Sequence, residues 1–431
     1  MSRKVNVAII GLGVRTEVLL ESFVHIPDVE VVAVCDLVEQ RIKHITEILA
    51  KHGKPAPKTF LDYHEMLKCE EIEAVFVPTS WNSHLSIAAD CMNAGKYVAI
   101  EVGGAASADE LWQLIHAYER TGKPCMMLEN CCYARDELMV LNMVRKGLFG
   151  ELIYCEGGYE HCLLDDHHGL HEEAFKERNY HNIHRNGDLY PTHELGPIAK
   201  ILNINRGNRF MSLTSTASKS RSAQAYRKKL AEQGKAVNPN LLFNEGDIVT
   251  TVIKCANGET ITLTHSVSLP RPYSRNGRVQ GTDGIWLEDA KGIYISGKSR
   301  DEICIDVAGN PYVSHHWDKV EDYYEEYDHP IWKEYKNHMV GGHNGIDILA
   351  ILAFLDAVRN QTNTPIDVYD VAAWMAVTCL SEQSIAIGSA PVPFPDFTNG
   401  KWVCREPAVK SRWALDDVYE ECFEDTVQSD E

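Results

Sequence analysis

The chain of 431 residues lacks long apolar runs, and it lacks any excess of positive charge. No apolar stretch approaches the roughly 20 residues of a membrane span, and the first strand-like run begins at Val5 without an apolar signal segment before it. A formal net charge of −20 would repel nucleic-acid phosphates and anionic lipid head groups. We therefore expect a cytoplasmic protein with no membrane or nucleic-acid partner and a small neutral or cationic ligand.

The chain also lacks a cysteine framework. Its 13 cysteines are an odd number scattered through strand-like and helix-like runs, a pattern typical of reduced thiols. The adjacent Cys131 and Cys132 have no metal-ligand spacing. What the chain does have is a 44% share of hydrophobic residues, enough for a large core, and its length predicts two domains.

The first 130 residues alternate between strand-like and helix-like patterns. Apolar runs predict strands at 5–11, 30–36, 74–77, 97–102 and 125–128. Such alternation predicts a parallel sheet covered on both faces, so we expect an α/β Rossmann domain, doubly wound, over residues 1–130.

Beyond residue 130 the pattern changes to short alternating segments. DIVTTVIKC and ETITLTHSV, joined by Ala256-Asn257-Gly258, predict an antiparallel hairpin with one exposed face. We expect residues 131–431 to form an α+β substrate-binding domain. The polar stretch 218–235 is interpreted as a solvated helix or loop, and the acidic last fifteen residues as a frayed tail.

A glycine turn follows the first strand. Gly11 and Gly13 would let the backbone approach a pyrophosphate at the following helix N-terminus. Thr16 occupies the place of the third fingerprint glycine, but Asp36 ends the second strand, where a carboxylate can accept ribose hydroxyls. Because an acid there repels a 2'-phosphate, we predict NAD rather than NADP. An ordinary glycine turn without cofactor is the alternative.

Two further segments lie at the ends of predicted strands. Trp81, Asn82, Ser83 and His84 follow the strand at 74–77, and the string Glu-Val-Gly-Gly at 101–104 ends the next strand. Ligands bind at this edge of open sheets, so we expect the nicotinamide half there. A lone tryptophan or histidine at such a place could instead cap a helix.

Residues 178–197 read RNYHNIHRNGDLYPTHELGP, a density of polar groups that suits a site better than a core. Tyr190 and His193 are three residues apart, so a helical turn would place a phenol beside an imidazole. An imidazole can take a hydroxyl proton near neutral pH, while a phenol or the Arg178 guanidinium can hold an oxyanion. With the glycine turn, this cluster predicts a redox enzyme.

Seven histidines between residues 161 and 193 raise the question of a metal, with His161, His167, His168 and His171 as candidate ligands. Their spacing matches no zinc pattern, and no carboxylate is an evident third ligand. We therefore predict no metal. His167, His168 and His171 are interpreted as satisfied surface residues.

A resemblance that covers nearly the whole chain rests on long and unusual strings, among them LENCCYARD, EGGYEH, HRNGDLYPTHELGPIAK, DIVTTVIKCANGETI and YDHPIWK. In these strings the chain resembles the Gfo/Idh/MocA oxidoreductases, and within them glycoside hydrolase family 109, the NAD-dependent α-N-acetylgalactosaminidases. The resemblance implies a dinucleotide domain followed by an open, mostly antiparallel sheet that carries the sugar pocket. We expect a homo-oligomer formed through that open sheet.

The resemblance also implies roles for particular residues. Contacts to NAD are expected from Val14, Arg15, Asp36, Trp81, Asn82, Ser83, His84, Glu101, Val102 and Asn130. The sugar would be surrounded by Tyr159, Arg178, Tyr190, His193 and Tyr273, with Glu129 as a further acid or base.

The chain departs from its relatives at three points. Ordinary redox members carry a lysine after the glutamate that ends the strand at 97–102, where Val102 and Gly103 stand here, and this favours the glycosidase branch. The stretch between Tyr159 and Arg178 is shorter than in the galactosaminidases, and Glu177 occupies a place where tryptophan is often found.

The predicted reaction follows from the resemblance. We expect cleavage of a terminal α-N-acetylgalactosaminide by transient oxidation at C3, elimination, water addition and re-reduction, rather than by a carboxylate pair. His193 and Tyr190 would handle the C3 hydroxyl proton, while Tyr159, Glu129 or a water could remove the C2 proton. The alternatives are a sugar dehydrogenase that releases a 3-keto glycoside, a glycosidase of the same mechanism with another sugar or anomer, and a non-catalytic NAD-binding protein.

Overall fold

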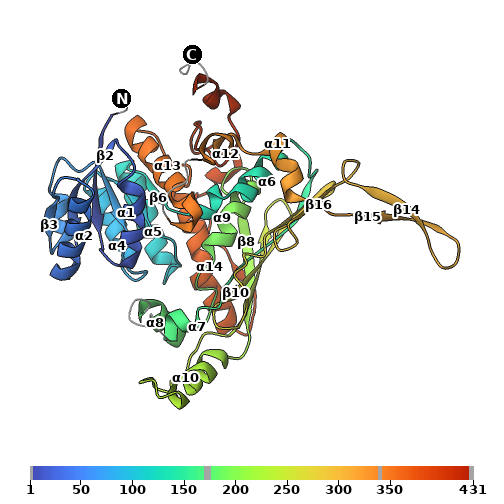
Figure 1. Cartoon of the computed structure of the whole chain (residues 1–431), viewed down its shortest axis with the longest axis horizontal. Coiled ribbons are helices and arrows are strands. Elements are labelled where there is room, and N and C mark those ends of the chain that lie inside the picture. The colour runs from blue at the N-terminus through green and yellow to red at the C-terminus, as the bar shows by residue number, and fades with distance from the viewer. Residues whose placement is uncertain (1–2, 169–175, 338–341, 427–431) are drawn as a thin grey trace.

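The computed structural model describes residues 3–168, 176–337 and 342–426. It contains two large sheets with helices between them, and a two-stranded ribbon that projects from the second sheet (Figure 1). No helix within these ranges is long and apolar enough to cross a membrane.

The first sheet has six parallel strands in the order β3-β2-β1-β4-β5-β6. The strands are β1 (Val5–Ile10), β2 (Val29–Cys35), β3 (Lys58–Phe60), β4 (Ala74–Val77), β5 (Tyr97–Ile100) and β6 (Cys125–Met127). The predicted Rossmann sheet is confirmed. The strand order reverses between β1 and β4, and ligands bind at the carboxyl ends of strands at such a switch point. Only β3 was missed, because its three residues are too short and too exposed to show a pattern.

Helices alternate with these strands. They are α1 (Val14–Phe23), α2 (Glu39–Lys51), α3 (Tyr63–Leu67), α4 (His84–Asn93) and α5 (Ala108–Thr121). The bounds of α5 follow from its sequence: the Ser107 side chain accepts the N–H of Glu110, and Gly122 ends the helix with φ +67°.

The second sheet has nine strands in the order β16-β13-β12-β11-β7-β10-β9-β8-β17. They are β7 (Leu152–Glu160), β8 (Phe210–Ala217), β9 (Val249–Cys255), β10 (Thr260–Ser266), β11 (Arg278–Gly281), β12 (Gly284–Leu287), β13 (Gly292–Ile295), β16 (Asp318–Lys319) and β17 (Val392–Pro393). The predicted hairpin is confirmed as β9 and β10, and the sheet is mostly antiparallel. The pair β7 and β10 is parallel, since the chain leaves β7 through helices and returns by way of β8 and β9.

Helices cover one face of this sheet. Short helices α7 (Leu164–His168) and α8 (Lys176–His184) lead from β7 to α9 (Thr192–Ile201), which packs on β7. Along β10, Ile261 and Leu263 face this core, whereas Thr260, Thr262 and Thr264 on the opposite face are half-exposed. We call that opposite side the open face of the sheet.

Two C-terminal helices join the sheets. Helix α14 (Val368–Ala386) contacts β6 and α5 on one side and β8 and α9 on the other. It is apolar almost all round and correspondingly buried. Helix α13 (Ile346–Asn360) packs on β1 and α1, with the Phe354 ring 5.1 Å from that of Phe76. The C-terminal region thus completes the core of the first sheet as well as the second.

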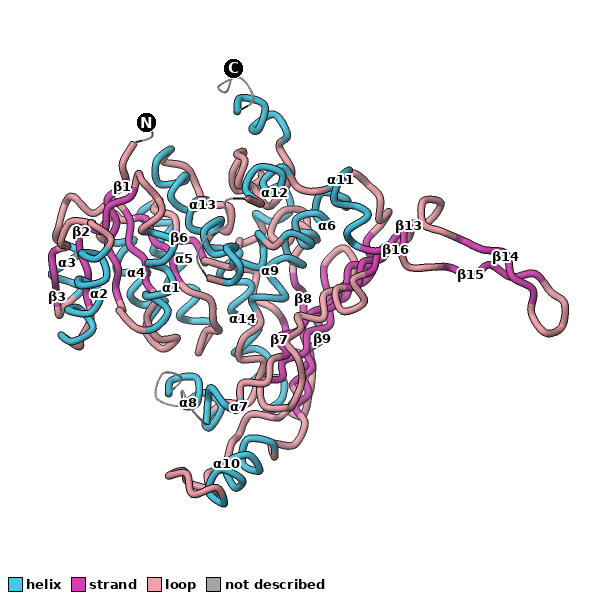
Figure 2. The backbone as a smooth tube through the Cα atoms, in the orientation of Figure 1, coloured by secondary structure: helices cyan, strands magenta, loops and turns pink. Residues whose placement is uncertain are grey.

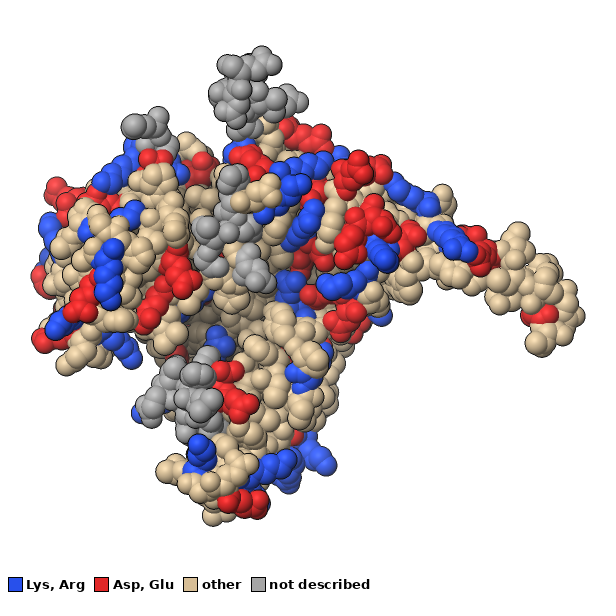
Figure 3. All heavy atoms as spheres, viewed as in Figure 1, with Lys and Arg blue, Asp and Glu red and all other residues tan. Residues whose placement is uncertain are grey.

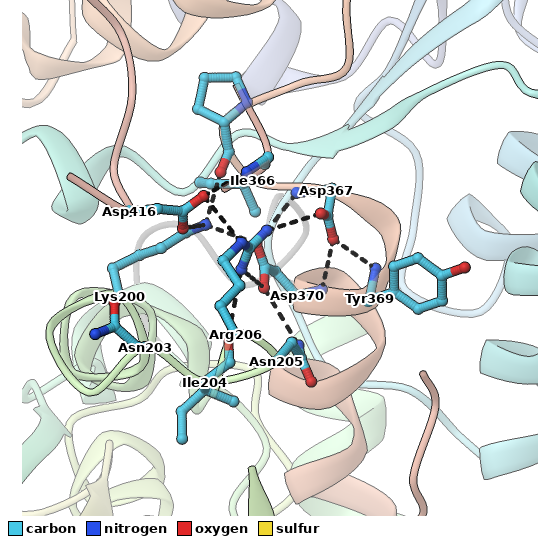
Figure 4. A network of polar contacts seen from close by, with 12 residues as sticks. Lys200, Asn203, Ile204, Asn205, Arg206, Ile366, Asp367, Tyr369, Asp370 and Asp416 are labelled. Atoms are coloured by element: carbon cyan, nitrogen blue, oxygen red, sulfur yellow. Dashed lines mark hydrogen bonds and ion pairs between the residues drawn. The ribbon is translucent and has the colours of Figure 1, made fainter. Parts of the chain in front are cut away.

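A buried charge network anchors the end of α9 (Figure 4). Lys200 donates to Asp370 Oδ2 at 2.7 Å and to Asp416 Oδ1 at 2.9 Å. Arg206 pairs with Asp367 at 2.8 Å and with Asp370 at 2.9 Å. With Arg405 beside Asp367, three cations face three carboxylates. The balance matters, because removing one member of a buried ion pair leaves an uncompensated charge.

The remaining elements connect or extend these layers. They are η1 (Asn130–Tyr133), α6 (Arg135–Arg145), α10 (Ser222–Glu232), β14 (Asp301–Ile305), β15 (Pro311–His315), η2 (Val320–Tyr323), α11 (Tyr324–Tyr327), α12 (Pro330–Tyr335), η3 (His343–Gly345), η4 (Lys401–Cys404) and η5 (Glu420–Thr426). The stretch 218–235, predicted as a solvated helix or loop, contains α10, in which Ala223 and Leu230 are buried. The acidic tail is not frayed over η5, since Glu420 pairs with Lys146 at 2.8 Å.

Candidate functional site

Two glycines leave the backbone open between β1 and α1. Gly11 has φ +89°, and a Cβ there would lie 2.6 Å from the Thr79 side chain that follows β4. Gly13 is the N-cap of α1, where none of the described atoms lies within 4 Å of the place of a Cβ and no side chain caps the helix. Val14 beside it is exposed. Free N–H groups at the positive end of a helix suit a pyrophosphate.

Asp36 stands at the same edge, directly after β2. Its Oδ2 accepts the N–H of Leu12 at 2.7 Å, and its Oδ1 accepts the N–H of Val38 at 2.8 Å. Thr16, at the place of the third glycine, donates its hydroxyl to the Gly11 carbonyl at 2.6 Å. The carboxylate therefore lies against the glycine turn, where the ribose of a dinucleotide is expected. These features fit NAD.

The segment after β4 lies over the segment after β5. A Cβ on Gly103, which has φ +153°, would lie 2.5 Å from Trp81 Nε1, so glycine permits the approach of the indole. Val102 is buried beside it. Its apolar side chain, at the place where the resemblance implies a lysine in ordinary redox members, can exchange no proton.

The rest of the β4 segment begins helix α4. Asn82 is exposed, and its N–H donates to Glu177 Oε1 of α8 at 3.4 Å. Ser83 is half-buried, and His84 is buried in the first turn. Burial lowers the pKa of His84 to about 4, so its imidazole is neutral at neutral pH.

An ion-pair cluster connects the first sheet to α13. Arg15 donates to Glu101 at 2.8 Å and to Asp347 at 2.7 Å. Asp347 also accepts the amide of Asn130 at 2.5 Å and contacts His343 Nδ1 at 3.0 Å. Burial would raise the pKa of Asp347, but His343 and Arg15 outweigh it and hold that pKa well below its usual range. Two predicted cofactor contacts, Arg15 and Asn130, therefore bind Asp347 directly, and a third, Glu101, is connected to it through Arg15. The sequence analysis missed Asp347.

A chain of polar contacts joins the two sheets at the predicted catalytic residues. Glu129, after β6, is fully buried, and its Oε1 lies 2.7 Å from His193 Nδ1. His193 Nε2 lies 3.2 Å from the Tyr190 hydroxyl. Burial would raise the pKa of Glu129, but the imidazole and the Cys131 N–H outweigh it, so that pKa is lowered and Glu129 stays a carboxylate. A carboxylate on Nδ1 directs Nε2 toward the phenol.

Two glycines allow α9, which carries His193, to approach Glu129 and β7 closely. A Cβ on Gly196 of α9 would lie 3.0 Å from Glu129 Cγ, and a Cβ on Gly157 of β7 would lie 2.6 Å from the Cβ of Glu194. Any larger side chain would push α9, and His193 with it, away from Glu129.

The other predicted sugar contacts surround Tyr190. Its ring lies 4.4 Å from that of Tyr159 and 5.7 Å from Trp81, and the Arg178 guanidinium lies 4.9 Å from its centre. The Tyr273 ring lies 6.3 Å from Tyr159. Burial raises the pKa of Tyr190 well above its usual range, so the phenol keeps its proton unless a ligand or base changes its surroundings.

A layer of buried acids behind Tyr159 was also missed. The His265 ring is nearly parallel to that of Tyr159 at 6.1 Å, and its Nε2 pairs with Glu245 at 2.8 Å. Burial raises the pKa of Asp188 to about 6 and that of Glu194 well above its usual range. Scattered acids in the sequence give no signal for such a layer, because their proximity depends on the fold.

Two sequence interpretations need correction. Tyr190 does not lie on a helical turn with His193, because α9 begins at Thr192 and Pro191 precedes it, although the two side chains do meet. His167 is buried rather than on the surface, and its Nδ1 lies 3.2 Å from the Asn182 amide. His171 and the side chain of His168 lie outside the described residues.

The residues that could hold a metal ion differ from the histidines that the sequence suggested. Within the described ranges, Glu129, Cys131 and His193 offer ligand atoms within 4.8 Å of one another. None of these is among the histidines first considered, of which His161 is half-buried. Burial raises the pKa of Cys131 well above its usual range, which disfavours the thiolate that binds metals.

Comparison with known proteins places both parts of the chain. Residues 5–129 match the model described as the oxidoreductase family, NAD-binding Rossmann fold, and residues 133–404 match glycosyl hydrolase 109, C-terminal domain. The fold and the N-terminal match thus define an NAD-binding protein of the Gfo/Idh/MocA class. Within that class the chain belongs to glycosyl hydrolase family 109, and it is a glycoside hydrolase.

The names of similar proteins agree with this family assignment. An alpha-N-acetylgalactosaminidase of Tannerella forsythia is 41% identical, with 93% of this chain and 87% of the relative covered. A glycosyl hydrolase family 109 protein of Parabacteroides distasonis is 39% identical, with 94% and 89% covered. An alpha-N-acetylgalactosaminidase of Shewanella oneidensis is 38% identical, with 94% and 87% covered.

Solved structures share the fold at lower identity. Levoglucosan dehydrogenase in complex with NADH and levoglucosan has a TM-score of 0.65 at 13% identity, covering 91% of this chain and 100% of that one. The myo-inositol 2-dehydrogenase of Lactobacillus plantarum has a TM-score of 0.61 at 16% identity, with 91% and 100% covered.

Substituting Asp347 by asparagine should weaken NAD binding by about 10- to 100-fold, because a buried amide cannot replace a carboxylate opposite Arg15. The readouts are NAD retained through gel filtration and the Kd measured by calorimetry. Asp356→Asn on the same helix is the matched control and should retain NAD as the native chain does. If the Asp347→Asn variant retained as much NAD as the native chain, Asp347 would not support the cofactor site.

Proposed function

We propose that this chain hydrolyses glycosides that end in α-linked N-acetylgalactosamine, through transient oxidation of the sugar at C3. The proposal is carried by the Glu129–His193–Tyr190 contacts, which begin at the cofactor edge of the first sheet and end among the predicted sugar residues. The substrate is taken from the relatives of Tannerella forsythia and Shewanella oneidensis, whose names specify it.

NAD would be held by the glycine turn, Asp36 and the Arg15–Asn130 side, and when bound it supplies a reversible two-electron oxidation at C3. Tyr190 and His193 exchange the proton of the C3 hydroxyl during that step. Arg178, close to Tyr190, stabilises negative charge on the C3 oxygen. Glu129 acts through His193, because its Oε1 is already hydrogen-bonded to the imidazole Nδ1.

The C3 ketone acidifies the hydrogen on C2, and loss of that proton expels the group on C1. Tyr159 is our candidate for the C2 base, since its ring lies beside Tyr190 at 4.4 Å and Glu129 is fully buried behind His193. Water then adds across the C1–C2 double bond, with its hydroxyl on C1 and a proton returned to C2, and the ketone is reduced again to the C3 hydroxyl. This route needs no pair of carboxylates across the glycosidic bond.

We also propose a homo-oligomer formed through the open face. Half-exposed threonines give the face a semi-polar character that suits contact with a second sheet.

The purified chain should release phenol from a chromogenic N-acetyl-α-galactosaminide without added NAD, because a cofactor regenerated in each turnover can stay bound. Phenol and the absorbance of reduced nicotinamide are followed together over many turnovers. Phenol should accumulate while reduced nicotinamide stays at or below one equivalent per site. Release of phenol only in step with reduced nicotinamide would instead identify a sugar dehydrogenase.

Substituting His193 by alanine should lower kcat by about 10² to 10⁴, the range for a positioned acid or base. Glu129→Gln should lower kcat and leave the sugar KM nearly unchanged, because the glutamine cannot stabilise an imidazolium. The exposed His52→Ala is the control and should keep native kinetics. An equal loss in His52→Ala would point to a general effect on folding, and native kcat in His193→Ala would remove His193 from the mechanism.

A further inference from the structure

A long hairpin projects from the edge of the second sheet, and over most of its length its backbone lies apart from the rest of the described chain (Figure 2). It consists of β14, a turn at residues 306–310 and β15, and it is rooted between β13 and β16. We call residues 298–317 the arm. An isolated two-stranded hairpin is marginally stable in water, so an arm of this kind is expected to pack against something.

One side of the arm is apolar and exposed. In its antiparallel register Ile303 pairs with Val313 and Ile305 with Pro311, which places these four side chains on the same side. The exposed fractions are 80% for Ile303, 65% for Ile305 and 51% for Val313. Exposure of this kind, over a contiguous strip, is typical of a surface that binds another protein.

The outer part of the arm, between Ile303 and Val313, is also nearly free of charge. Between Ile303 and Val313 the only charged residue is Asp306, and its Oδ1 accepts the N–H groups of Ala308 and Asn310, both at 2.8 Å. Figure 3 shows this part of the arm in tan apart from one red group near its tip, whereas the body carries many charged groups of both signs. In a chain of net charge −20, such a segment can approach a second copy with little repulsion.

The root of the arm is built to hold its direction. His315 Nδ1 lies 2.8 Å from Asp301 and 2.9 Å from the Tyr294 hydroxyl of β13. Lys298 donates to Glu326 at 2.8 Å and to the Tyr327 hydroxyl at 2.7 Å. The arm therefore continues beyond the edge of the open face in a set direction.

We propose that the arm packs against a second copy of this chain and clasps a dimer formed through the two open faces; this rests on the homo-oligomer proposed above. The seven longer strands of the sheet, of four to nine residues each, span roughly 700 Å² at about 4.8 Å between strands and about 3.3 Å per residue. A standard interface buries about 800 Å² per partner. The arm supplies the additional area.

A dimer of this kind is two-fold symmetric. A two-fold axis parallel to the strands lays the β16 edge of one sheet over the β17 edge of the other. Because the arm is rooted between β13 and β16, each arm then starts over β17 and β8 of the other copy, where Met211 is exposed. Each copy contributes one arm and one receiving edge, so the assembly closes as a dimer.

The test is the mass of the full chain in solution, by sedimentation or light scattering over a wide range of concentration. The native chain should have twice the mass of 48.5 kDa. The double variant Ile303→Glu/Val313→Glu should weaken self-association at least about 100-fold, because charges replace the apolar centre of the contact. The exposed Ile387→Glu, outside both surfaces, is the matched control and should remain dimeric.

A third variant separates the arm from the sheet. If Thr262→Arg on the open face gives monomers while the arm variant remains dimeric, the arm proposal is wrong and the sheet interface stands. A native chain that is monomeric at every concentration, with or without binding to phosphatidylcholine vesicles, overturns both. Hydrolysis by each variant is measured separately, so that failure of the proposed function is recognised independently.

Discussion

The hydrogen bond between His193 Nδ1 and Glu129 Oε1, 2.7 Å long, is the contact on which the rest of the site depends. It joins the end of the parallel sheet to the helix that lies on the second sheet, so it sets the distance between the cofactor edge and the sugar residues. Both groups are buried, and a buried pair of this kind is stabilising only when its geometry is good. The missing side chains of Gly157 and Gly196 make that geometry possible.

Helix α9 is held at both ends, and each end has a different task. Its first turn carries His193, and its last turn carries Lys200 in the balanced network with Asp370 and Asp416. The network includes the N-terminal residues of α14, which contacts both sheets. Stability and function are therefore coupled through one short helix. Loss of the charges around Lys200 would shift the helix and, with it, the His193 imidazole.

Much of the fold could be predicted because its signals are local. Alternating apolar and helical patterns identified the Rossmann sheet, and the turn at Gly258 identified the β9–β10 hairpin. The parallel pairing of β7 with β10 could not be predicted, since nothing in either strand specifies its neighbour. The sugar residues came from long family strings rather than from spacing, and the helical turn assumed for Tyr190 was wrong. The role of Asp347 could not be predicted, because it lies 217 residues along the chain from Asn130, which it contacts.

The central claim is that the glycosidic bond is broken by elimination from a C3-oxidised sugar and not by displacement at C1. Elimination removes the hydrogen on C2, whereas displacement leaves it in place. The most direct test is hydrolysis in heavy water, with the early sugar product examined by NMR. The account predicts deuterium at C2 of the released sugar, and full retention of hydrogen at C2 would contradict it.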